Sequence, residues 1–453
     1  MAINADGGPD LVTPPTPNTR RRIRDNLAWL LGDRLSRAAL NVVVVSVVAR
    51  YLGPDQFGLL NYTISLAAIF ATVATLGFEG IVIRELLAHP EQKNAVLGTA
   101  CALRFGGGLV AIALVTLTGL LTRNGETVLP LALVVSLGFL PQALEVIDLW
   151  FQKNIQSRMT VLAKSGAALL GAGSKLALVW AQAPLAWFAA AVVLDALLAA
   201  AALTWIFHQR GEGLRQWRVT RAMTHTLLRD SWPLIVSGLL IALYLRVEQL
   251  LVMNWLGESA AGVYFAAVKF ADAWTFAPGL IISSVYPLLV QERQRGGVEY
   301  ERQLQLLFDA LTGLGLIVAV GVTFTGPWLL PLIFGEKYAA AVPVLVILGW
   351  TAPITFSGAA RAQLFLLEKL TIYHTWSALI GIAANVGLGL WLMPRWGAPG
   401  AALGALVGYW VSAYGTTLVF PQLRPWAGLQ TRAFLIPLRP GRLLVLWKDQ
   451  RED

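Results

Sequence analysis

Twelve long apolar stretches dominate this sequence, and each is long enough to cross a membrane as a helix. The hydrocarbon core of a bilayer is about 30 Å thick, so a spanning helix needs about 20 predominantly apolar residues. We therefore predict an all-α membrane protein with twelve transmembrane helices, at residues 27–49, 57–83, 95–121, 127–149, 159–181, 183–207, 231–255, 260–290, 307–330, 339–366, 370–393 and 397–420.

The composition agrees with a membrane protein. Hydrophobic residues make up 56% of the 453 residues and charged residues only 13%, whereas charged residues are about 25% of a typical soluble domain. The single cysteine, Cys101, rules out an internal disulfide, and the four histidines show no ligand spacing. The sequence therefore predicts no metal site and no bound cofactor.

The basic residues predict the topology. Most Lys and Arg residues lie in the tails and in the even-numbered loops between spans, and the other side receives only Arg50, Arg123, Lys337 and Arg395. Because basic loops stay in the cytoplasm, both termini are predicted to be cytoplasmic. The net charge of +9 then indicates anchoring at the inner leaflet of the lipid bilayer, with no nucleic-acid partner.

The longest connection between spans carries five arginines and divides the chain into two halves of six spans. We predict a flexible basic tail at 1–25, a first bundle at 26–208, a basic linker at 209–230, a second bundle at 231–421 and a basic tail at 422–453. The tail at the start carries prolines and then arginines in place of the apolar core of a cleavable signal, so we expect it to be cytoplasmic.

The two halves echo one another. Leu52, Gly53 and Gly58 match Leu256, Gly257 and Gly262 at a constant offset of 204 (256 minus 52), and Ala183-Pro184 matches Ala398-Pro399 at 215 (398 minus 183). Six spans separate the copies, so the halves share one orientation. This is the parallel repeat that transporters place around a central site.

Glycines and prolines inside the spans predict local features. Gly400, Gly404 and Gly408 recur at spacing four in the last span, which favours close helix packing in lipid. Four prolines lie inside predicted spans, where they predict kinks or local unwinding: Pro141, Pro233, Pro278 and Pro353.

Fifteen charged residues fall inside the spans, which predicts a water-filled cavity because lone charges are costly in lipid. Eight are basic: Arg34, Arg37, Arg104, Lys164, Lys175, Arg246, Lys269 and Arg361. Seven are acidic: Asp33, Glu79, Glu145, Asp148, Asp195, Glu248 and Asp272. Five lie near cytoplasmic span ends, and for these we expect snorkelling to water: Lys164, Arg361, Glu79, Glu145 and Asp148.

Among the deeper charges, Asp195 lies alone at mid-depth of its span, so it is expected to pair across helices or to take a proton or sodium ion. Lys269 and Asp272 are three residues apart, a spacing at which the two can neutralise each other on one helical face. A deep arginine most needs an anion, and its planar fork suits the diphosphate of a lipid carrier.

Several motifs, in their order along the chain, resemble the bacterial polysaccharide-biosynthesis flippases, which carry O-antigen and capsule precursors. Their superfamily also holds multidrug exporters and lipid II flippases. The residues that carry this resemblance are Val48 to Leu59, Leu76-Gly77-Phe78, Arg84-Glu85, Leu256-Gly257, Gly262-Val263-Tyr264, Phe334 to Tyr338 and Trp396 to Ala402.

The resemblance implies two six-helix bundles forming a V around a central cationic cavity. It also implies that an undecaprenyl-diphosphate-linked oligosaccharide moves across the cytoplasmic (inner) membrane by alternating access, coupled to H⁺ or Na⁺, alongside other polysaccharide assembly proteins. Our own interpretation of the charges gives the site. We expect substrate contacts from Arg34, Arg37, Arg246 and Lys269, then Arg104 and Lys175, and ion coupling by Glu248, Asp272 and Asp195.

Three alternatives stay open. A multidrug exporter of the same superfamily binds cations and should have an acid-dominated cavity, whereas the membrane charges here nearly cancel. A lipid II flippase would share the same architecture. A membrane glycosyltransferase or polymerase needs a sizeable outer loop with catalytic carboxylates, but the predicted outer loops are short, so we expect a protein that is not an enzyme.

Overall fold

The computed structural model describes residues 17–121, 125–154, 156–295, 297–368 and 370–435, and these residues form helices and turns with no strand. Ten of the described helices are long and apolar enough to cross a membrane, and the bent pair Glu336–Gly349 and Ala352–Leu367 makes an eleventh. The first of the ten, Leu40–Ala88, covers two predicted spans because its helix is interrupted at Gly53. The prediction of twelve membrane helices is therefore confirmed.

Helices alone satisfy their own backbone hydrogen bonds in lipid, which is why apolar stretches of this length fold as they do. The first half comprises α1 (Pro17–Thr75), α2 (Glu79–Ala88), η1 (Pro90–Gln92), α3 (Lys93–Leu121), α4 (Gly125–Ser136), α5 (Phe139–Gln142), η2 (Ala143–Glu145), α6 (Val146–Lys153), α7 (Ser157–Trp180) and α8 (Leu185–Gln209). A short connection, η3 (Leu214–Gln216), leads to the second half.

The second half begins with α9 (Arg221–Leu256), α10 (Glu258–Ala271), η4 (Asp272–Trp274), α11 (Ala277–Arg295) and α12 (Val298–Phe334). It continues with η5 (Glu336–Ala341), α13 (Val342–Gly349), α14 (Ala352–Leu367), α15 (Thr371–Trp396) and α16 (Ala398–Trp410). It ends with the π-helical turn η6 (Val411–Gly415), α17 (Thr416–Val419), η7 (Pro421–Leu423) and α18 (Arg424–Phe434).

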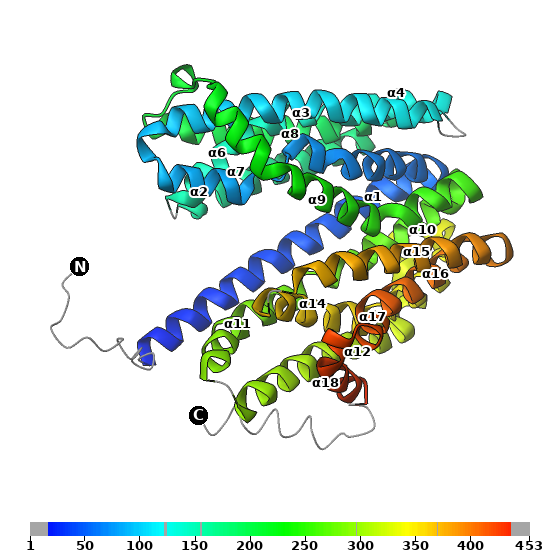
Figure 1. The fold of residues 1–453 in the computed structure, drawn as a ribbon. Helices are drawn as coiled ribbons and strands as arrows, with labels where there is room; N and C mark the ends of the chain where they lie inside the picture. Colours follow the sequence, from blue (N-terminus) through cyan, green and yellow to red (C-terminus); the bar gives the residue numbers. More distant parts are fainter. Residues whose placement is uncertain (1–16, 122–124, 155, 296, 369, 436–453) are drawn as a thin grey trace.

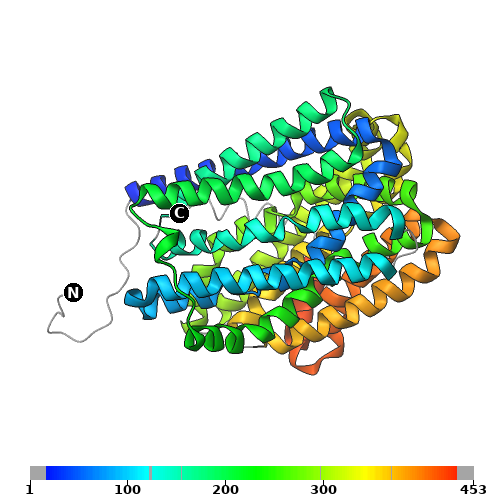
Figure 2. The same ribbon diagram turned by 90° about the horizontal axis from the view of Figure 1, so that it is seen from above.

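The two bundles form a V, which Figure 1 shows with the first bundle above the second. At one end a single apolar core contains residues of both bundles, such as Phe57 and Val135 of the first and Phe265 and Leu345 of the second. Toward the other end two separate cores remain, one around Phe151 in the first bundle and one around Phe308 in the second. The bundles therefore join at one end and part at the other. Seen from above, the long helices of both run in the same general direction (Figure 2).

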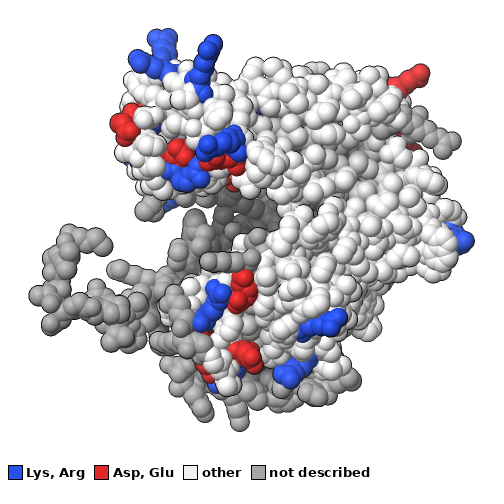
Figure 3. Space-filling view, in the orientation of Figure 1, with Lys and Arg blue, Asp and Glu red and all other residues white. Residues whose placement is uncertain are grey.

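We call the joined end the glycine end, because Gly53, Gly257, Gly335 and Gly397 all interrupt or end helices there with positive φ angles. We call the other end the basic end, because it carries the arginine-rich connection between α8 and α9. Figure 3 shows charged side chains gathered on both bundles at this end, where a notch separates the two bundles.

The predicted repeat is visible in the backbone. Gly53 has φ 72° and ψ 172°, and Gly257 has φ 88° and ψ −176°. Ala183-Pro184 is preceded by Gln182 at φ 51°, and Ala398-Pro399 by Gly397 at φ 61°. Both pairs of turns thus have matching left-handed conformations, which non-glycine residues rarely adopt.

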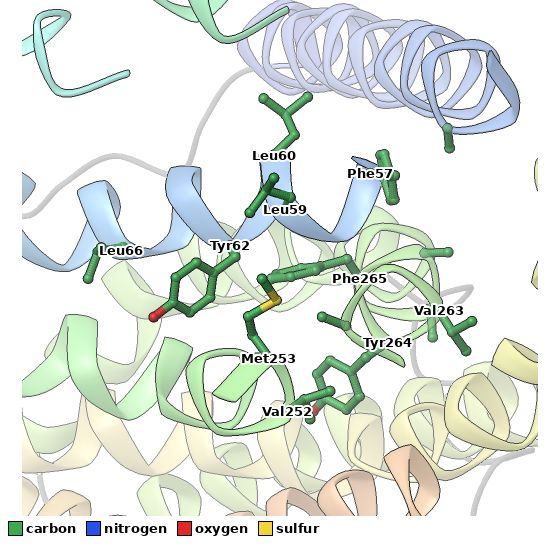
Figure 4. Close-up of a cluster of buried hydrophobic side chains, with 14 of the residues drawn as sticks. Phe57, Leu59, Leu60, Tyr62, Leu66, Val252, Met253, Val263, Tyr264 and Phe265 are labelled. Carbon is green, nitrogen blue, oxygen red and sulfur yellow. The ribbon is translucent and has the colours of Figure 1, made fainter. Parts of the chain in front are cut away.

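The two repeated Leu-Gly turns also touch one another. A Cβ atom on Gly58 would lie 2.1 Å from the carbonyl oxygen of Glu258, and one on Gly262 would lie 1.9 Å from that of Pro54. Only glycine permits this approach between α1 and α10. Figure 4 shows the apolar side chains just inside it, with Phe57 and Tyr62 of α1 beside Met253 of α9 and Phe265 of α10.

Polar contacts reinforce the glycine end. The guanidinium of Arg50 donates from Nε to the carbonyl oxygen of Ile333 at 2.9 Å and from Nη2 to that of Leu332, near the C-terminus of α12. A cation is stabilised there because it interacts with the free carbonyl groups of the last helical turn. The Tyr338 hydroxyl donates to the carbonyl oxygen of Ala49 at 2.8 Å. These bonds join the first bundle to the second.

The proline predictions had mixed outcomes. Helix breaks lie beside Pro141, at α5, and beside Pro353, where α13 and α14 meet at 40°. The break expected around Pro278 covers residues 272–276, before α11 begins at Ala277. Pro233 lies inside α9, and the helix continues through it without unwinding.

The boundary between bundles differs from the one drawn on sequence. Residues 221–230 of the predicted linker are the first turns of α9, and they contribute Met223 and Leu227 to the core of the first bundle. Leu234 packs against Gly77 of the first bundle. Helix α9 thus begins beside the first bundle and crosses into the second.

Candidate functional site

Three cavities lie along the space between and within the bundles. One, about 570 Å³ and called the second-bundle cavity below, lies in the second bundle and includes Arg246 and Asp272 in its lining. A cavity of about 590 Å³ in the first bundle includes Lys175 and Asp195. A smaller one, about 120 Å³, contacts both bundles because Lys175 and Lys269 line it together. The cavities therefore bring together charges that are distant in sequence.

Arg246 lines the second-bundle cavity from α9, half-buried. Its Nη1 donates to the side-chain oxygen Oε1 of Gln249 at 3.2 Å, and the same oxygen accepts from the Ser65 hydroxyl of α1 at 2.7 Å. The guanidinium is thus held by a neutral amide without an ion-pair partner within 4.0 Å among the described residues. It keeps donors available for an anion.

Lys175 and Asp195 form an ion pair between α7 and α8, with 2.5 Å between Nζ and Oδ2. The Oδ1 atom of Asp195 packs against Gly171, where a Cβ would lie 1.9 Å away, and it is buried without a hydrogen bond. The sequence-based alternative that Asp195 pairs across helices matches this contact. Lys175 has about a quarter of its side chain exposed to the cavities, so an anion can compete for it.

Lys269 and Asp272 lie at the end of α10, and Asp272 is the strongest of the charged neighbours that act on Lys269. The chain continues from α10 into η4 with Asp272 in a helical conformation (φ −59°, ψ −22°), so the i, i+3 spacing of the two residues is kept. Lys269 lines the small cavity together with Lys175, and Asp272 lines the second-bundle cavity together with Arg246. The other charged neighbours that act on Lys269 are Arg246 and Lys175, so this region holds three cations together with the carboxylates of Asp272 and Asp195.

Glu248 is the most enclosed acid of the predicted set. It lies on α9 with 6% of its surface exposed, and it lines the second-bundle cavity. Its carboxylate accepts a hydrogen bond from Asn385 Nδ2 of α15 at 3.2 Å. The Oδ1 atom of Asn385 is buried with no partner. Together the two side chains offer oxygens that suit a proton or a small cation.

Other predicted contacts lie elsewhere. The side chains of Arg34 and Arg37 lie outside the described residues, although the backbone of α1 passes through both positions. Arg104 is buried inside the first bundle, 3% exposed, with Nε and Nη2 unbonded and with Glu145, Glu79 and Asp148 as its charged neighbours. It does not line the three cavities described above.

The snorkelling expectation was wrong for Arg361. Its side chain is 4% exposed and turns into the second bundle, where it donates to the hydroxyls of Thr416 and Thr417 at 2.9 Å and to the carbonyl oxygen of Ser412 at 2.7 Å. The π-helical turn around Ser412 widens the helix and frees this carbonyl. Lys164 follows a different pattern, with its Nζ 2.7 Å from Asp148 Oδ2 and 3.7 Å from Glu145 Oε2.

Comparison with known proteins explains this architecture. A family model described as "Polysaccharide biosynthesis protein" matches residues 23–292, more than half of the chain. The chain belongs to the polysaccharide biosynthesis protein family. A similar protein is the lipopolysaccharide biosynthesis protein WzxC of Escherichia coli K12, 25% identical over 430 residues, with 88% of this chain and 80% of the relative covered.

A second relative is the succinoglycan biosynthesis transport protein ExoT of Rhizobium meliloti, 25% identical over 353 residues, with 74% of this chain and 67% of the relative covered. The fold of this family member is also that of solved transporters. An inward-facing multidrug MATE transporter matches with TM-score 0.68 and 16% identity, covering 87% of this chain and 96% of its own. The inward closed lipid II flippase MurJ matches with TM-score 0.68 and 14% identity, covering 92% and 91%. At these identities the likeness concerns the fold.

Proposed function

We propose that this family member is a flippase that moves a polyprenyl-diphosphate-linked oligosaccharide across the cytoplasmic membrane by alternating access, for the biosynthesis of a surface polysaccharide. The observation that carries the proposal is that Lys175 and Lys269 line one cavity between the bundles, while Arg246, a charged neighbour of Lys269, lines the second-bundle cavity. A diphosphate needs such a group of cations when it leaves water for the apolar middle of a bilayer. The role is transport, with no catalytic residue assigned.

The proposed orientation places the basic end in the cytoplasm and the glycine end outside. It is supported by the gathering of Lys and Arg in the connections at the notched end, which stay on the cytoplasmic side. The conformation is then open to the cytoplasm and closed to the outside by Gly58 and Gly262. The parting of this contact and the closure of the notch would carry the bound headgroup to the outer leaflet.

The coupling ion, H⁺ or Na⁺, is proposed to act at Glu248, with Asn385 as its neighbour. Glu248 lies in the second bundle beside the same cavity as Arg246. A cation on Glu248 changes the charge that Arg246 meets, which links ion binding to anion binding. Asp272 and Asp195 are the further candidates for this role.

Glu248→Gln is expected to keep binding and to lose the response to an ion gradient. Glutamine retains an oxygen that accepts from Asn385, so the fold survives, but it cannot be protonated or balance a cation. Translocation in proteoliposomes with an imposed proton or sodium gradient should fall to the rate of the wild type without a gradient. Glu126→Gln, at an exposed position at the start of α4, should respond as the wild type does. A gradient response retained in Glu248→Gln would exclude this residue from coupling.

The proposed function is tested with purified protein in liposomes that carry undecaprenyl-diphosphate-linked oligosaccharide in one leaflet. A probe specific for the opposite leaflet, such as a lectin or glycosidase, should detect transfer that depends on the protein. Protein-dependent export of organic cations, with no transfer of diphosphate lipids, would instead favour a multidrug exporter and refute the proposal.

A further inference from the structure

The second-bundle cavity lies where two membrane helices are interrupted. One interruption is η4 with Thr275, between α10 and α11, and the other is the 40° bend between α13 and α14. Residues from both interruptions line the cavity, including Asp272 and Thr351. Irregular backbone at membrane depth persists where it lines a cavity or is buried in protein, and transporters place substrate at such breaks.

The lining of this cavity is chemically mixed, unlike a site for a bare diphosphate. The exposed residue Asp272 and the half-buried Gln363 of α14 both line it. Neither side chain has a hydrogen-bond or ion-pair partner among the described residues. Thr355 and Trp274 also line the cavity, together with apolar residues such as Val268 and Pro278. Acceptors, donors and an aromatic face are what a sugar needs, because its hydroxyls both donate and accept while its C–H face packs on a ring.

One wall of the cavity carries an unsatisfied group. Tyr264 lines the cavity, its side chain is fully buried, and its hydroxyl has no hydrogen-bond partner. A buried polar group without a partner costs about 1–3 kcal/mol. Such a group is expected where a ligand supplies the missing partner.

The cations near this cavity would fix the position of the diphosphate. Arg246 lines the same cavity, and Lys269 lies three residues before Asp272 at the neighbouring cavity. A diphosphate held by these cations would place the group attached to it beside Trp274 and Gln363. The first-bundle cavity has a different lining: four alanines, Asn41, Lys164 and the Lys175–Asp195 ion pair are among its residues.

We propose that the second-bundle cavity binds the sugar residue nearest the diphosphate, with Trp274 as a stacking surface and with Asp272 and Gln363 as hydrogen-bonding partners of its hydroxyls. The proposal rests on the proposed function and adds a division of labour: the cations hold the diphosphate and the second bundle selects the sugar. Substrate choice in this protein would then depend on the second bundle.

The test compares binding of farnesyl diphosphate with binding of farnesyl diphosphates that carry glucose, galactose or N-acetylglucosamine, using the full-length protein in nanodiscs. At least one sugar-bearing probe should bind tenfold or more tightly than farnesyl diphosphate. Gln363→Ala should reduce that ratio to about one and leave the affinity for farnesyl diphosphate unchanged. Trp274→Leu should also reduce the ratio. Trp328→Leu removes a tryptophan that is exposed on α12 and should leave the ratio unchanged.

The outcomes separate the two proposals. If the wild type binds farnesyl diphosphate but no sugar improves the affinity, or if the gain survives in both Gln363→Ala and Trp274→Leu, the sugar site is refuted and the flippase proposal stands. If the wild type binds none of the diphosphate probes, both are refuted. Gln363→Ala guards against misfolding as an explanation, because this half-buried side chain loses no hydrogen bond within the described protein.

Discussion

Gly262→Ala is expected to remove most translocation and to shift the protein away from the conformation described above. The added methyl group would lie 1.9 Å from the carbonyl oxygen of Pro54, which belongs to the backbone and cannot rotate away. Overpacking of this kind costs about 1–3 kcal/mol. Since a factor of ten corresponds to about 1.4 kcal/mol, the closed glycine end becomes roughly 5- to 150-fold less populated. Gly58→Ala, which meets Glu258 in the same way, should behave alike.

The shift can be measured by thiol labelling. In a Cys101→Ser background, a cysteine replaces Ala261, which is fully buried in this conformation. A membrane-impermeant maleimide applied from outside should label it slowly, and Gly58→Ala should accelerate the labelling. Gly106→Ala in α3 is the control, because its Cβ would meet no atom within 4 Å. Unchanged labelling and translocation in both glycine variants would show that this contact does not close the outer side.

Arg246→Ala is expected to cause the largest loss of diphosphate-lipid binding among single cation substitutions. A hydrogen bond to a charged group contributes about 1.5–3 kcal/mol, so the affinity should fall roughly 10- to 150-fold. The fold should survive, because Gln249 still accepts from Ser65 after the guanidinium is removed. Arg246→Lys keeps the charge but loses the planar fork, and it should restore binding in part.

Lys164→Ala is the matched control for Arg246. This lysine is held by Asp148 and Glu145 near the basic end, so its loss should impair translocation less. Both variants must first be shown to insert and to elute as folded protein, since an unpaired buried charge can destabilise a protein by itself. Equal effects, or a larger effect for Lys164→Ala, would move the diphosphate site toward the first bundle.

Most of the architecture could be predicted from the sequence, because a long apolar stretch in a membrane must form a helix, whatever lies elsewhere in the chain. Apolar length gave the spans, and the echo of Leu52-Gly53 in Leu256-Gly257 gave the repeat that the backbone angles reproduce. The direct packing of Gly58 against the turn at Glu258 was not predicted. It depends on how two helices cross, and a spacing within one helix carries no information about that.

The charged residues were harder to predict for the same reason. Lys175 and Asp195 are adjacent only because α7 and α8 lie side by side. Arg361 was expected to reach water, but the π-helical turn around Ser412 offers it partners inside the bundle. Gln363 and Trp274 were not considered, because neutral side chains in a span carry no sign of cavity exposure. A helix break at residues 272–276 could have pointed to Trp274.

The claim that this protein binds a diphosphate-linked oligosaccharide between its helices is tested most directly by photo-crosslinking from a residue that lines the second-bundle cavity. Thr275 is exposed and lines the second-bundle cavity. This residue is replaced by a photoreactive phenylalanine derivative. Ile317, 70% exposed on α12, is replaced in the same way as the control. The flippase account predicts that position 275 labels undecaprenyl-diphosphate-linked oligosaccharide, that farnesyl diphosphate competes, and that position 317 shows no such competition. Equal labelling at both positions, or competition by organic cations alone, would contradict it.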